Sequence, residues 1–178
     1  DPTEVALIAY SDKIGYPYQD LREKSPRLAE FPFDSERKLM STINDFEGQK
    51  TIFVKGGPDV LFNRCNQVFL DGKVQEFTPE LKEKFQAQNE AFSQKALRVL
   101  AYAYKPVSDD KTELTLNDEN DLILIGLSAM IDPPREAVYD SIAEAKKAGI
   151  KTIMITGDHK TTAQAIAKDI GLMNEGDM

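Results

Sequence analysis

The sequence has little of the chemistry on which several classes of site depend. Its 178 residues include a single cysteine, Cys65, and a single histidine, His159. An intrachain disulfide is therefore excluded, a reducing compartment is the natural setting, and a zinc site with several such ligands cannot form. The longest strongly apolar run, Leu122 to Ile131, falls well short of the roughly 20 residues that a membrane-spanning helix needs. We therefore expect no direct insertion of this chain into a membrane.

Positive charge is outnumbered by negative charge. The chain has 22 Lys and Arg residues against 30 Asp and Glu residues, which gives a net charge of −8. Nucleic acid is bound by clustered cations, so we expect no nucleic-acid partner. A phosphate ligand would have to be held by a few local cations within an acidic surface. What the chain does have is a hydrophobic fraction of 41%, enough for a packed core. Because it begins at Asp1 without a signal peptide, we expect a piece of a longer protein.

Up to about residue 131, the pattern is that of short strands and helices joined by tight turns. Asp1-Pro2-Thr3-Glu4 and Thr78-Pro79-Glu80 each predict a capped helix start. Asp71-Gly72 between two apolar runs predicts a hairpin. These features favour an antiparallel α+β domain, a sheet flanked by helices. We expect helices that begin near residues 2, 20, 58 and 79, and strands over residues 31–33, 38–44, 51–55, 68–70, 74–77, 99–104 and 122–131, the last fully buried.

After Asp132-Pro133-Pro134-Arg135 the order changes to helix, strand and helix. This alternation is typical of a parallel α/β sheet. We therefore place a boundary at the paired prolines, with one domain over residues 1–131 and part of another over residues 132–178. The elements expected in the second part are a helix over 136–148, a strand over 151–155 and a helix over 160–170.

Basic residues near the strands are candidates for a phosphate site. Arg37 and Lys38 precede one strand, and Lys55 ends another beside Gly56-Gly57. Glycines let a backbone approach a phosphate closely, and a following helix start adds unpaired N–H groups. A tight turn with a solvated lysine is the commoner cause of such a pattern, because glycine-rich turns are frequent.

Three other residues have both a functional and an ordinary interpretation. Phe33 is able to stack on a base, although a strand phenylalanine is usually a core residue. Glu4 is explained as the glutamate of a capping box. Arg98, at a helix-to-strand junction, is explained as an exposed cation.

Thr156-Gly157-Asp158 follows a predicted strand and precedes a helix. A hydroxyl, a free backbone and a carboxylate would then lie at the carboxyl edge of a parallel strand, where α/β sheets bind ligands. An ordinary turn with Asp158 as the N-cap is the alternative, and His159 is then an exposed residue at the helix start. By contrast, Asp110-Lys111-Thr112 lies in an acidic loop with no strand to deliver it, so Asp110 is not expected to be a nucleophile.

Six motifs in order resemble the P-type ATPases, especially their calcium-pump-like branch. They span nearly the whole chain, and together they are far more specific than any one of them. The motifs are Asp1-Pro2-Thr3-Glu4, FDSERKLMS over 33–41, Lys55-Gly56-Gly57-Pro58-Asp59, LRVLA over 97–101, Asp132-Pro133-Pro134-Arg135, and MITGD over 154–158.

The resemblance implies a role for each candidate in binding ATP. Phe33 would stack on adenine, with Glu4 and Lys38 lining the pocket. Lys55 would lie deep in that pocket, Gly56 and Gly57 would leave room for the ligand, and Arg98 would reach the phosphate chain. Residues Asp132, Pro133, Pro134 and Arg135 would form a hinge into a haloacid-dehalogenase-like phosphorylation domain. In that domain Thr156, Gly157 and Asp158 would bind the transferred phosphoryl group.

The resemblance also implies what the chain lacks. The phosphorylated aspartate would precede Asp1, and the magnesium site of the phosphorylation domain would follow Met178. We therefore expect the chain to bind ATP with Mg²⁺ but neither to hydrolyse it nor to move an ion. Its partners would be the phosphorylation, actuator and transmembrane domains of the same pump. It would be a soluble part of an integral membrane protein, on the cytoplasmic face, with calcium as the favoured ion.

Two other functions remain compatible with parts of the sequence. The first is an independent phosphatase that uses Asp158 or Asp132, which requires a nucleophilic aspartate delivered by a strand. The second is an interaction module without enzymatic activity, whose glycines and lysines are structural. The first predicts activity toward an aryl phosphate, and the second predicts a fold that nucleotide does not stabilise.

Overall fold

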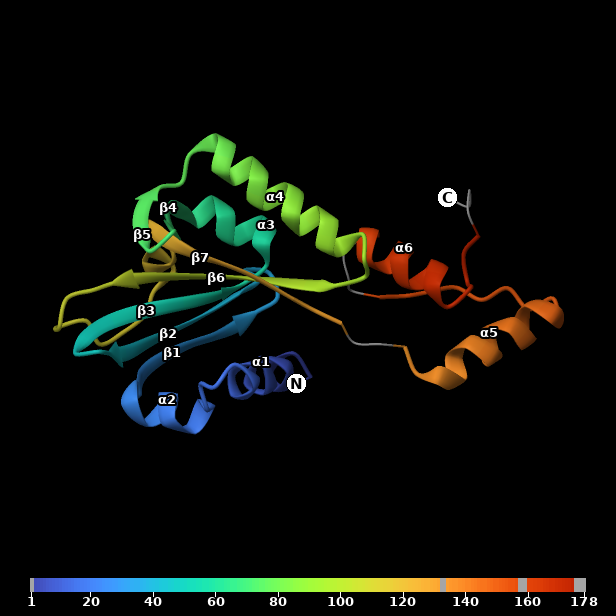
Figure 1. Ribbon diagram of the computed structural model, residues 1–178, viewed down its shortest axis with the longest axis horizontal. Coiled ribbons are helices and arrows are strands. Elements are labelled where there is room, and N and C mark those ends of the chain that lie inside the picture. The colour runs from blue at the N-terminus through green and yellow to red at the C-terminus, as the bar shows by residue number, and fades with distance from the viewer. Residues whose placement is uncertain (1, 132–133, 157–159, 175–178) are drawn as a thin grey trace. The chain divides into compact units, whose positions relative to one another are not determined.

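The computed structural model describes residues 2–131, 134–156 and 160–174 (Figure 1). The chain forms two compact units. The first comprises Asp1–Gln86 and Val99–Ser128, and the second comprises Ala87–Arg98 and Ala129–Met178.

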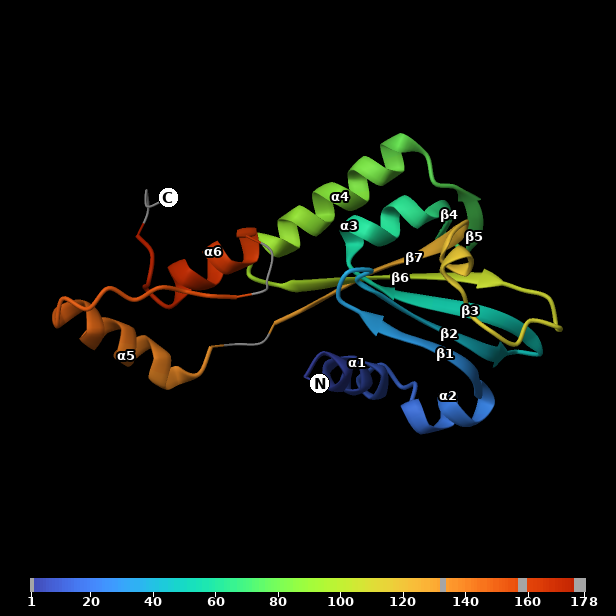
Figure 2. The same cartoon turned by 180° about the vertical axis from the view of Figure 1, so that it is seen from behind.

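A seven-stranded sheet forms the framework of the first unit, in the order β1-β2-β3-β6-β7-β4-β5 (Figure 2). The pairs β1–β2, β2–β3, β3–β6 and β4–β5 are antiparallel, as expected, but β4 and β7 are parallel. Every strand expected before residue 131 is present, with ends that differ by a few residues. The strands are β1 (Arg27–Asp34), β2 (Leu39–Phe46), β3 (Gln49–Gly56), β4 (Cys65–Leu70), β5 (Lys73–Glu76), β6 (Arg98–Pro106) and β7 (Leu122–Met130).

Two hairpin turns follow directly from local sequence. The φ angles are 53° and 80° at Glu47 and Gly48, and 52° and 76° at Asp71 and Gly72. Positive φ at both central residues is the type I′ arrangement, whose twist matches that of the flanking strands. The predicted Asp71-Gly72 hairpin is therefore confirmed.

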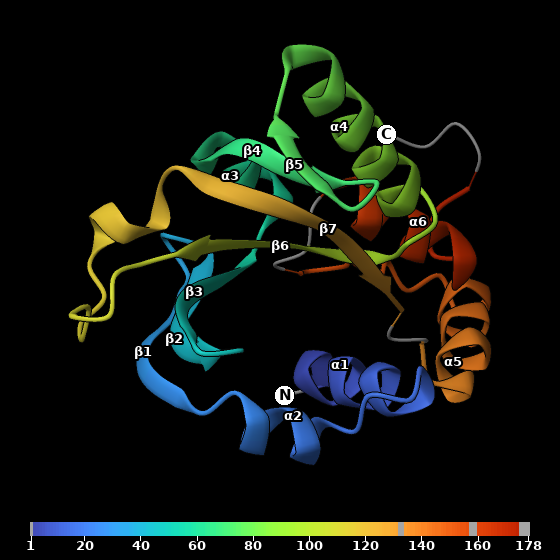
Figure 3. The ribbon, with the colours of Figure 1, turned by 60° about the vertical axis from the view of Figure 1, so that its left-hand side comes forward.

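Helices cover both faces of this sheet. In Figure 3, α1 and α2 lie across one face, and α3 with the start of α4 lies on the other. A 3₁₀ turn, η1, extends α3, and another, η2, interrupts the acidic loop after β6, where the sequence had indicated only a loop. The helical elements are α1 (Pro2–Lys13), α2 (Tyr18–Lys24), α3 (Pro58–Leu61), η1 (Phe62–Arg64), α4 (Pro79–Ser93), η2 (Leu116–Glu119), α5 (Glu136–Lys147) and α6 (Lys160–Asp169).

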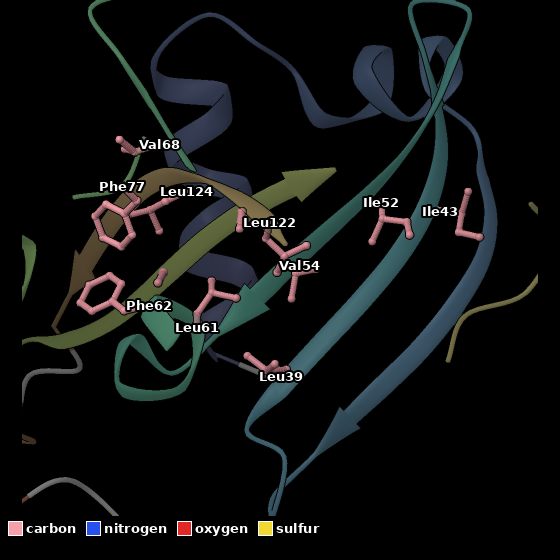
Figure 4. Close-up of a cluster of buried hydrophobic side chains, with 12 residues drawn as sticks. Leu39, Ile43, Ile52, Val54, Leu61, Phe62, Val68, Phe77, Leu122 and Leu124 are labelled. Atoms are coloured by element: carbon pink, nitrogen blue, oxygen red, sulfur yellow. The ribbon is translucent and has the colours of Figure 1, made fainter. Parts of the chain in front are cut away.

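The core lies between the sheet and the α3–α4 layer. Alternate residues of a strand point to opposite faces, and Leu39 and Ile43 of β2 are fully buried on this side. Phe62, Phe77 and Phe85 pack edge to face, with ring centroids 5.8 to 6.2 Å apart. Figure 4 shows Phe62 and Phe77 among the buried side chains of this core. This arrangement adds to the stability from buried area alone. The alternate residues of β2 and β3 point to the opposite face of the sheet, the face that α1 and α2 cross.

The expectation that β7 is fully buried is wrong beyond its first residues. Leu122, Ile123 and Leu124 are buried, but the side chains from Ile125 onward are half-buried or exposed. The parallel partner β4 reaches only these first residues, from Leu122 to Leu124. Without that neighbour the rest of β7 loses its cover on one side.

In the second unit, the expected helices are confirmed and the expected strand is not. Helix α5 ends before Gly149, whose φ of 73° suits glycine at a helix end. Tyr139 of α5 donates a hydrogen bond of 2.7 Å to Asp169 at the end of α6. Residues 151–155 are not a strand, and Ile153 and Ile155 are 71% and 94% exposed. Among the described residues no strand pairs with this segment, and a single strand leaves its backbone groups without ladder partners.

Candidate functional site

The sheet face opposite the core carries a cavity of about 180 Å³. Strand pairing sets Met40, Lys55 and Tyr102 side by side on β2, β3 and β6. The next row contains Thr42 and Phe53. All of these point away from the core, because the alternate residues of β2 fill it. The residues lining the cavity are Arg27, Met40, Thr42, Phe53, Val54, Lys55, Tyr102, Ala103 and Ile125.

Lys55 is the cation within this cavity that the sequence had singled out. Its side chain is 24% exposed, and its Nζ forms an ion pair with Oε1 of Glu4 on α1. The two predicted residues, 51 positions apart, therefore meet. Helix α1 has no buried residue among those described, and the ion pair joins this helix to strand β3. Glu4 therefore has a role that the predicted capping box does not explain, because it pairs with Lys55. The other member of that box, Asp1, lies outside the described residues.

Tyr102 contributes an aromatic ring and a neutral hydroxyl beside Lys55. Its hydroxyl shares a hydrogen bond of 2.7 Å with Oγ of Ser128. Burial raises the pKa of Tyr102, and the charge of Glu4 adds to the rise, while the bond from Ser128 acts in the opposite direction. The phenol therefore stays uncharged at neutral pH and offers the cavity a ring rather than an anion.

Lys38 and the glycines form a tight corner where β2 begins and β3 ends. Lys38 has a φ of 57°, its carbonyl accepts a bond of 3.1 Å from the N–H of Gly57, and its Nζ pairs with Asp59 at 2.9 Å. A Cβ on Gly56 would lie 2.1 Å from the Lys38 carbonyl oxygen, so no side chain fits there. Helix α3 has only four residues, too short to contribute much of the helix dipole expected from the sequence.

Phe33 is 62% exposed at the end of β1. It is therefore not a core residue, and its ring is available for stacking. Asp34 follows it and organises the turn into β2, since its Oδ1 accepts from the N–H groups of Glu36 and Arg37 at 3.0 and 2.8 Å. This turn connects Phe33 to Lys38, so the two predicted residues lie at the ends of one short segment.

Arg37, which the sequence made a candidate for the phosphate site together with Lys38, is instead largely buried and already paired. Its side chain is 8% exposed and pairs with Glu119 of η2, which is 1% exposed. Oγ of Ser41 donates to the same carboxylate. The sequence gives no sign of this pairing, because the partners are 82 positions apart and Glu119 lies in a loop of many acids.

Arg27 is a basic residue of the cavity lining that the sequence analysis did not single out. It pairs with Asn44, but Ala29 pairs with Ile43, so the register shifts between them. A bulge of this kind re-aims side chains. Here the bulge turns Arg27 to the cavity face. There Arg27 forms an ion pair with Glu30.

Comparison with known proteins decides the family. The family model for the P-type ATPase, cytoplasmic domain N, matches residues 1–137. The chain belongs to the P-type ATPases. A calcium-transporting ATPase of Lactococcus lactis is 99% identical over 178 residues, covering 100% of this chain and 20% of that protein. One of Listeria monocytogenes is 61% identical with the same coverage. The sodium/potassium-transporting ATPase α-1 subunit of Oreochromis mossambicus is 38% identical over 189 residues, covering 99% of this chain and 18% of the subunit. The chain thus spans about a fifth of the length of these relatives.

The cavity and its surroundings lie wholly within the stretch that matches domain N of the P-type ATPases. The structure brings Glu4 to Lys55 and places Phe33, Lys38, Gly56 and Gly57 near one end of the same sheet. Arg98, at the start of β6, belongs to the second unit and is exposed. Its predicted role stays a prediction.

The residues expected to serve the phosphorylation domain of a P-type ATPase are only partly described. Thr156 is exposed at the end of the irregular segment 151–156. Pro134 and Arg135 immediately precede α5. Gly157, Asp158 and His159 lie outside the described residues, as do Asp132 and Pro133. Both the hinge and the phosphoryl-binding role therefore remain predictions.

The described part of the chain has neither a cluster of metal-ligating side chains nor a membrane-spanning helix. No group of three or more His, Cys, Asp or Glu residues there is arranged to hold a metal ion. In the same residues, no helix combines the length and the apolar character that crossing a bilayer requires.

Proposed function

We propose that this chain is the ATP-binding domain of a calcium-transporting P-type ATPase and that it holds the nucleotide on the cavity face of the β2–β3–β6 sheet. The observation that carries the proposal is the meeting of Glu4 and Lys55 at a cavity lined by aromatic and aliphatic side chains. Small-molecule sites combine apolar walls with a few placed polar groups. This cavity has that composition.

The adenine base would use the apolar part of the site. Phe33 presents an exposed ring, and Met40, Phe53 and Tyr102 line the cavity. Stacking on Phe33 would cover a large exposed aromatic surface with another flat ring. The neutral hydroxyl of Tyr102 adds no negative charge against an anionic ligand.

The anionic part of ATP would be met by local cations in an acidic chain. Lys55 already faces a carboxylate in Glu4, so its ammonium group is placed for an anion. Lys38 lies on the other side of Gly56 and Gly57, paired with Asp59 at an exposed position that a phosphate can reach. Arg98 would reach the phosphate chain, as the resemblance to the family implies. Mg²⁺ would travel with the nucleotide, held mainly by its phosphates and by water.

In the intact pump, this domain would present the γ-phosphate to an aspartate that this chain does not contain. Phosphoryl transfer depends chiefly on positioning and charge neutralisation. Residues 132–135 would act as the hinge for closure, and Thr156, Gly157 and Asp158 would bind the transferred group. The chain itself would bind ATP without hydrolysing it. Calcium is the proposed ion because two of the relatives are named for its transport.

Titration with ATP tests this function. We expect saturable binding by calorimetry, with backbone amide shifts around Phe33 and Lys55. Phe33→Ala and Lys55→Ala should each weaken binding by about tenfold or more, since both remove a direct contact. Matched controls are Phe69→Ala and Lys73→Ala, which change exposed residues of the β4–β5 hairpin and should leave affinity unchanged. Undiminished affinity in folded Phe33→Ala and Lys55→Ala would contradict the site, and no binding at all would contradict the function.

A further inference from the structure

Arg37 and Glu119 join the turn after β1 to the loop before β7. Their side chains are 8% and 1% exposed. Oγ of Ser41, on β2, donates to the same oxygen of Glu119 that Arg37 contacts. Glu119 is therefore held by two residues of the β1–β2 hairpin.

The guanidinium of Arg37 also holds the end of β1. Its Nη2 donates to the carbonyl of Pro32, and its Cζ lies 4.0 Å from the centroid of the Phe31 ring, within the range of a cation–π interaction. The backbone N–H of Arg37 donates to Asp34 at 2.8 Å. Arg37 thus contacts the two residues before Phe33 and the one after it.

Stability alone is a weak reason for such a pair. Removing two charges from water is costly, and apolar residues often replace buried ion pairs without loss. Here Oε2 of Glu119 has no hydrogen-bond partner among the described residues, so the pair is not even fully satisfied. A planar guanidinium instead fixes the relative positions of its partners, because its N–H groups donate to several acceptors in one rigid geometry.

We propose that the Arg37–Glu119 pair is a positioning device for the nucleotide base, which holds the end of β1 so that the ring of Phe33 is ready to stack. The inference rests on the proposed function, since it requires Phe33 to contact the base. Phe33 is 62% exposed, so packing of its side chain does not fix the orientation of the ring. The backbone around Phe33 must therefore fix that orientation. Binding is tighter when a contact residue is ordered in advance.

A double-mutant cycle between Arg37 and Phe33 tests this role. Arg37→Lys keeps the charge and loses the fork. We expect it to weaken ATP binding by about tenfold in the native background and by less than about twofold when Phe33 is already alanine, because residues that act through each other are not additive. Glu119→Gln should behave like Arg37→Lys. Equal losses in both backgrounds would overturn the proposal.

The matched control is Arg64→Lys. Arg64 donates a hydrogen bond of 2.7 Å to Asn120, the neighbour of Glu119, so the same substitution loosens the same loop without touching β1. It should lower the melting temperature and leave ATP affinity unchanged. If Arg64→Lys weakens ATP binding as much as Arg37→Lys does, loop stability rather than positioning explains the effect.

A second readout keeps this inference separate from the proposed function. If the unmutated chain does not bind ATP, the proposed function fails, and hydrogen exchange then decides the positioning. Arg37→Lys should speed exchange of the Phe31 and Asp34 amides by about tenfold relative to the Asp71-Gly72 hairpin, because a local tie has been removed. Unchanged exchange at those amides would overturn the inference.

Discussion

Oε1 of Glu4 and Nζ of Lys55 form an ion pair that ties α1 to the face of the sheet carrying the cavity. The pair is partly exposed, with the two side chains 49% and 24% accessible. In the proposed complex the anion of the nucleotide would compete with Glu4 for Lys55. The helix would then exchange one electrostatic partner for another when ATP binds.

Glu4→Gln should loosen α1 without unfolding the domain. Partly exposed ion pairs contribute about 1 kcal/mol or less and weaken with salt. We therefore expect faster hydrogen exchange in α1, a free energy of unfolding changed by less than about 1 kcal/mol, and a smaller effect in high salt. Glu23→Gln on α2 is the control for charge alone. Equal exchange rates in the two variants would show that the ion pair does not hold the helix.

Arg37→Met should be among the costly single substitutions in this domain. It leaves Glu119 buried without its partner, which typically costs about 3 to 5 kcal/mol. The double variant Arg37→Met with Glu119→Leu removes both charges and should recover most of that loss. Urea unfolding measures both. A double variant as unstable as the single one would mean that the charges themselves, and not their pairing, stabilise the fold.

Gly56→Ala should destabilise the corner between β2 and β3. The added Cβ would lie 2.1 Å from the carbonyl oxygen of Lys38 and 2.8 Å from the side chain of Leu39. Forcing atoms into such a site typically costs about 1 to 3 kcal/mol. Gly57→Ala is the comparison, because its Cβ would meet a side-chain atom of Asp59 at 2.6 Å, which is free to turn away. Thermal unfolding should rank Gly56→Ala as the less stable, and the reverse order would contradict the packing.

Cys65 should be an unreactive thiol in the folded domain. Burial raises its pKa from 9.0 to about 12, although the charge of Lys82 acts in the opposite direction. A pKa this high leaves almost no thiolate near pH 8, and the thiolate is the reactive form. Alkylation by iodoacetamide should therefore be slow until urea unfolds the chain. Rapid alkylation under native conditions would show that the thiol is accessible and ionisable.

The raised pKa of Cys65 also predicts that the folded domain loses stability at high pH. The folded state keeps the proton on Cys65 above pH 9, where the unfolded state begins to lose it, so the unfolded state gains stability as the pH rises toward 12. Stability should fall over that window, and less so in Cys65→Ala. An identical pH dependence in both proteins would contradict the raised pKa.

Local chemistry made much of the first unit predictable. Asp71-Gly72 and Glu47-Gly48 have the residues that a hairpin turn requires, and Pro58 and Pro79 mark helix starts, so the element order could be inferred. The contacts that complete the site could not. Glu119 meets Arg37 across 82 positions, and a register shift, not a motif, turns Arg27 toward the cavity. Such pairings depend on tertiary packing, which cannot be inferred from a short segment of sequence.

The segment 151–155 shows the opposite failure. Its apolar composition is that of a buried strand, yet Ile153 and Ile155 are exposed. A strand is stabilised by its neighbours through ladder bonds and cross-strand packing. The composition of a segment predicts a strand only where a neighbouring strand is available to pair with it. Among the described residues, segment 151–155 has no such neighbour.

The sheet order has a consequence for how the domain meets other copies of itself. Strands β1 and β5 are the two edges, and an exposed edge is a template for another chain. Strand β5 is only four residues long. On β1, Pro32 has no N–H to offer, and its carbonyl is already occupied by Arg37. The strand that carries the exposed Phe33 is thereby also a strand that resists being extended by a second protein.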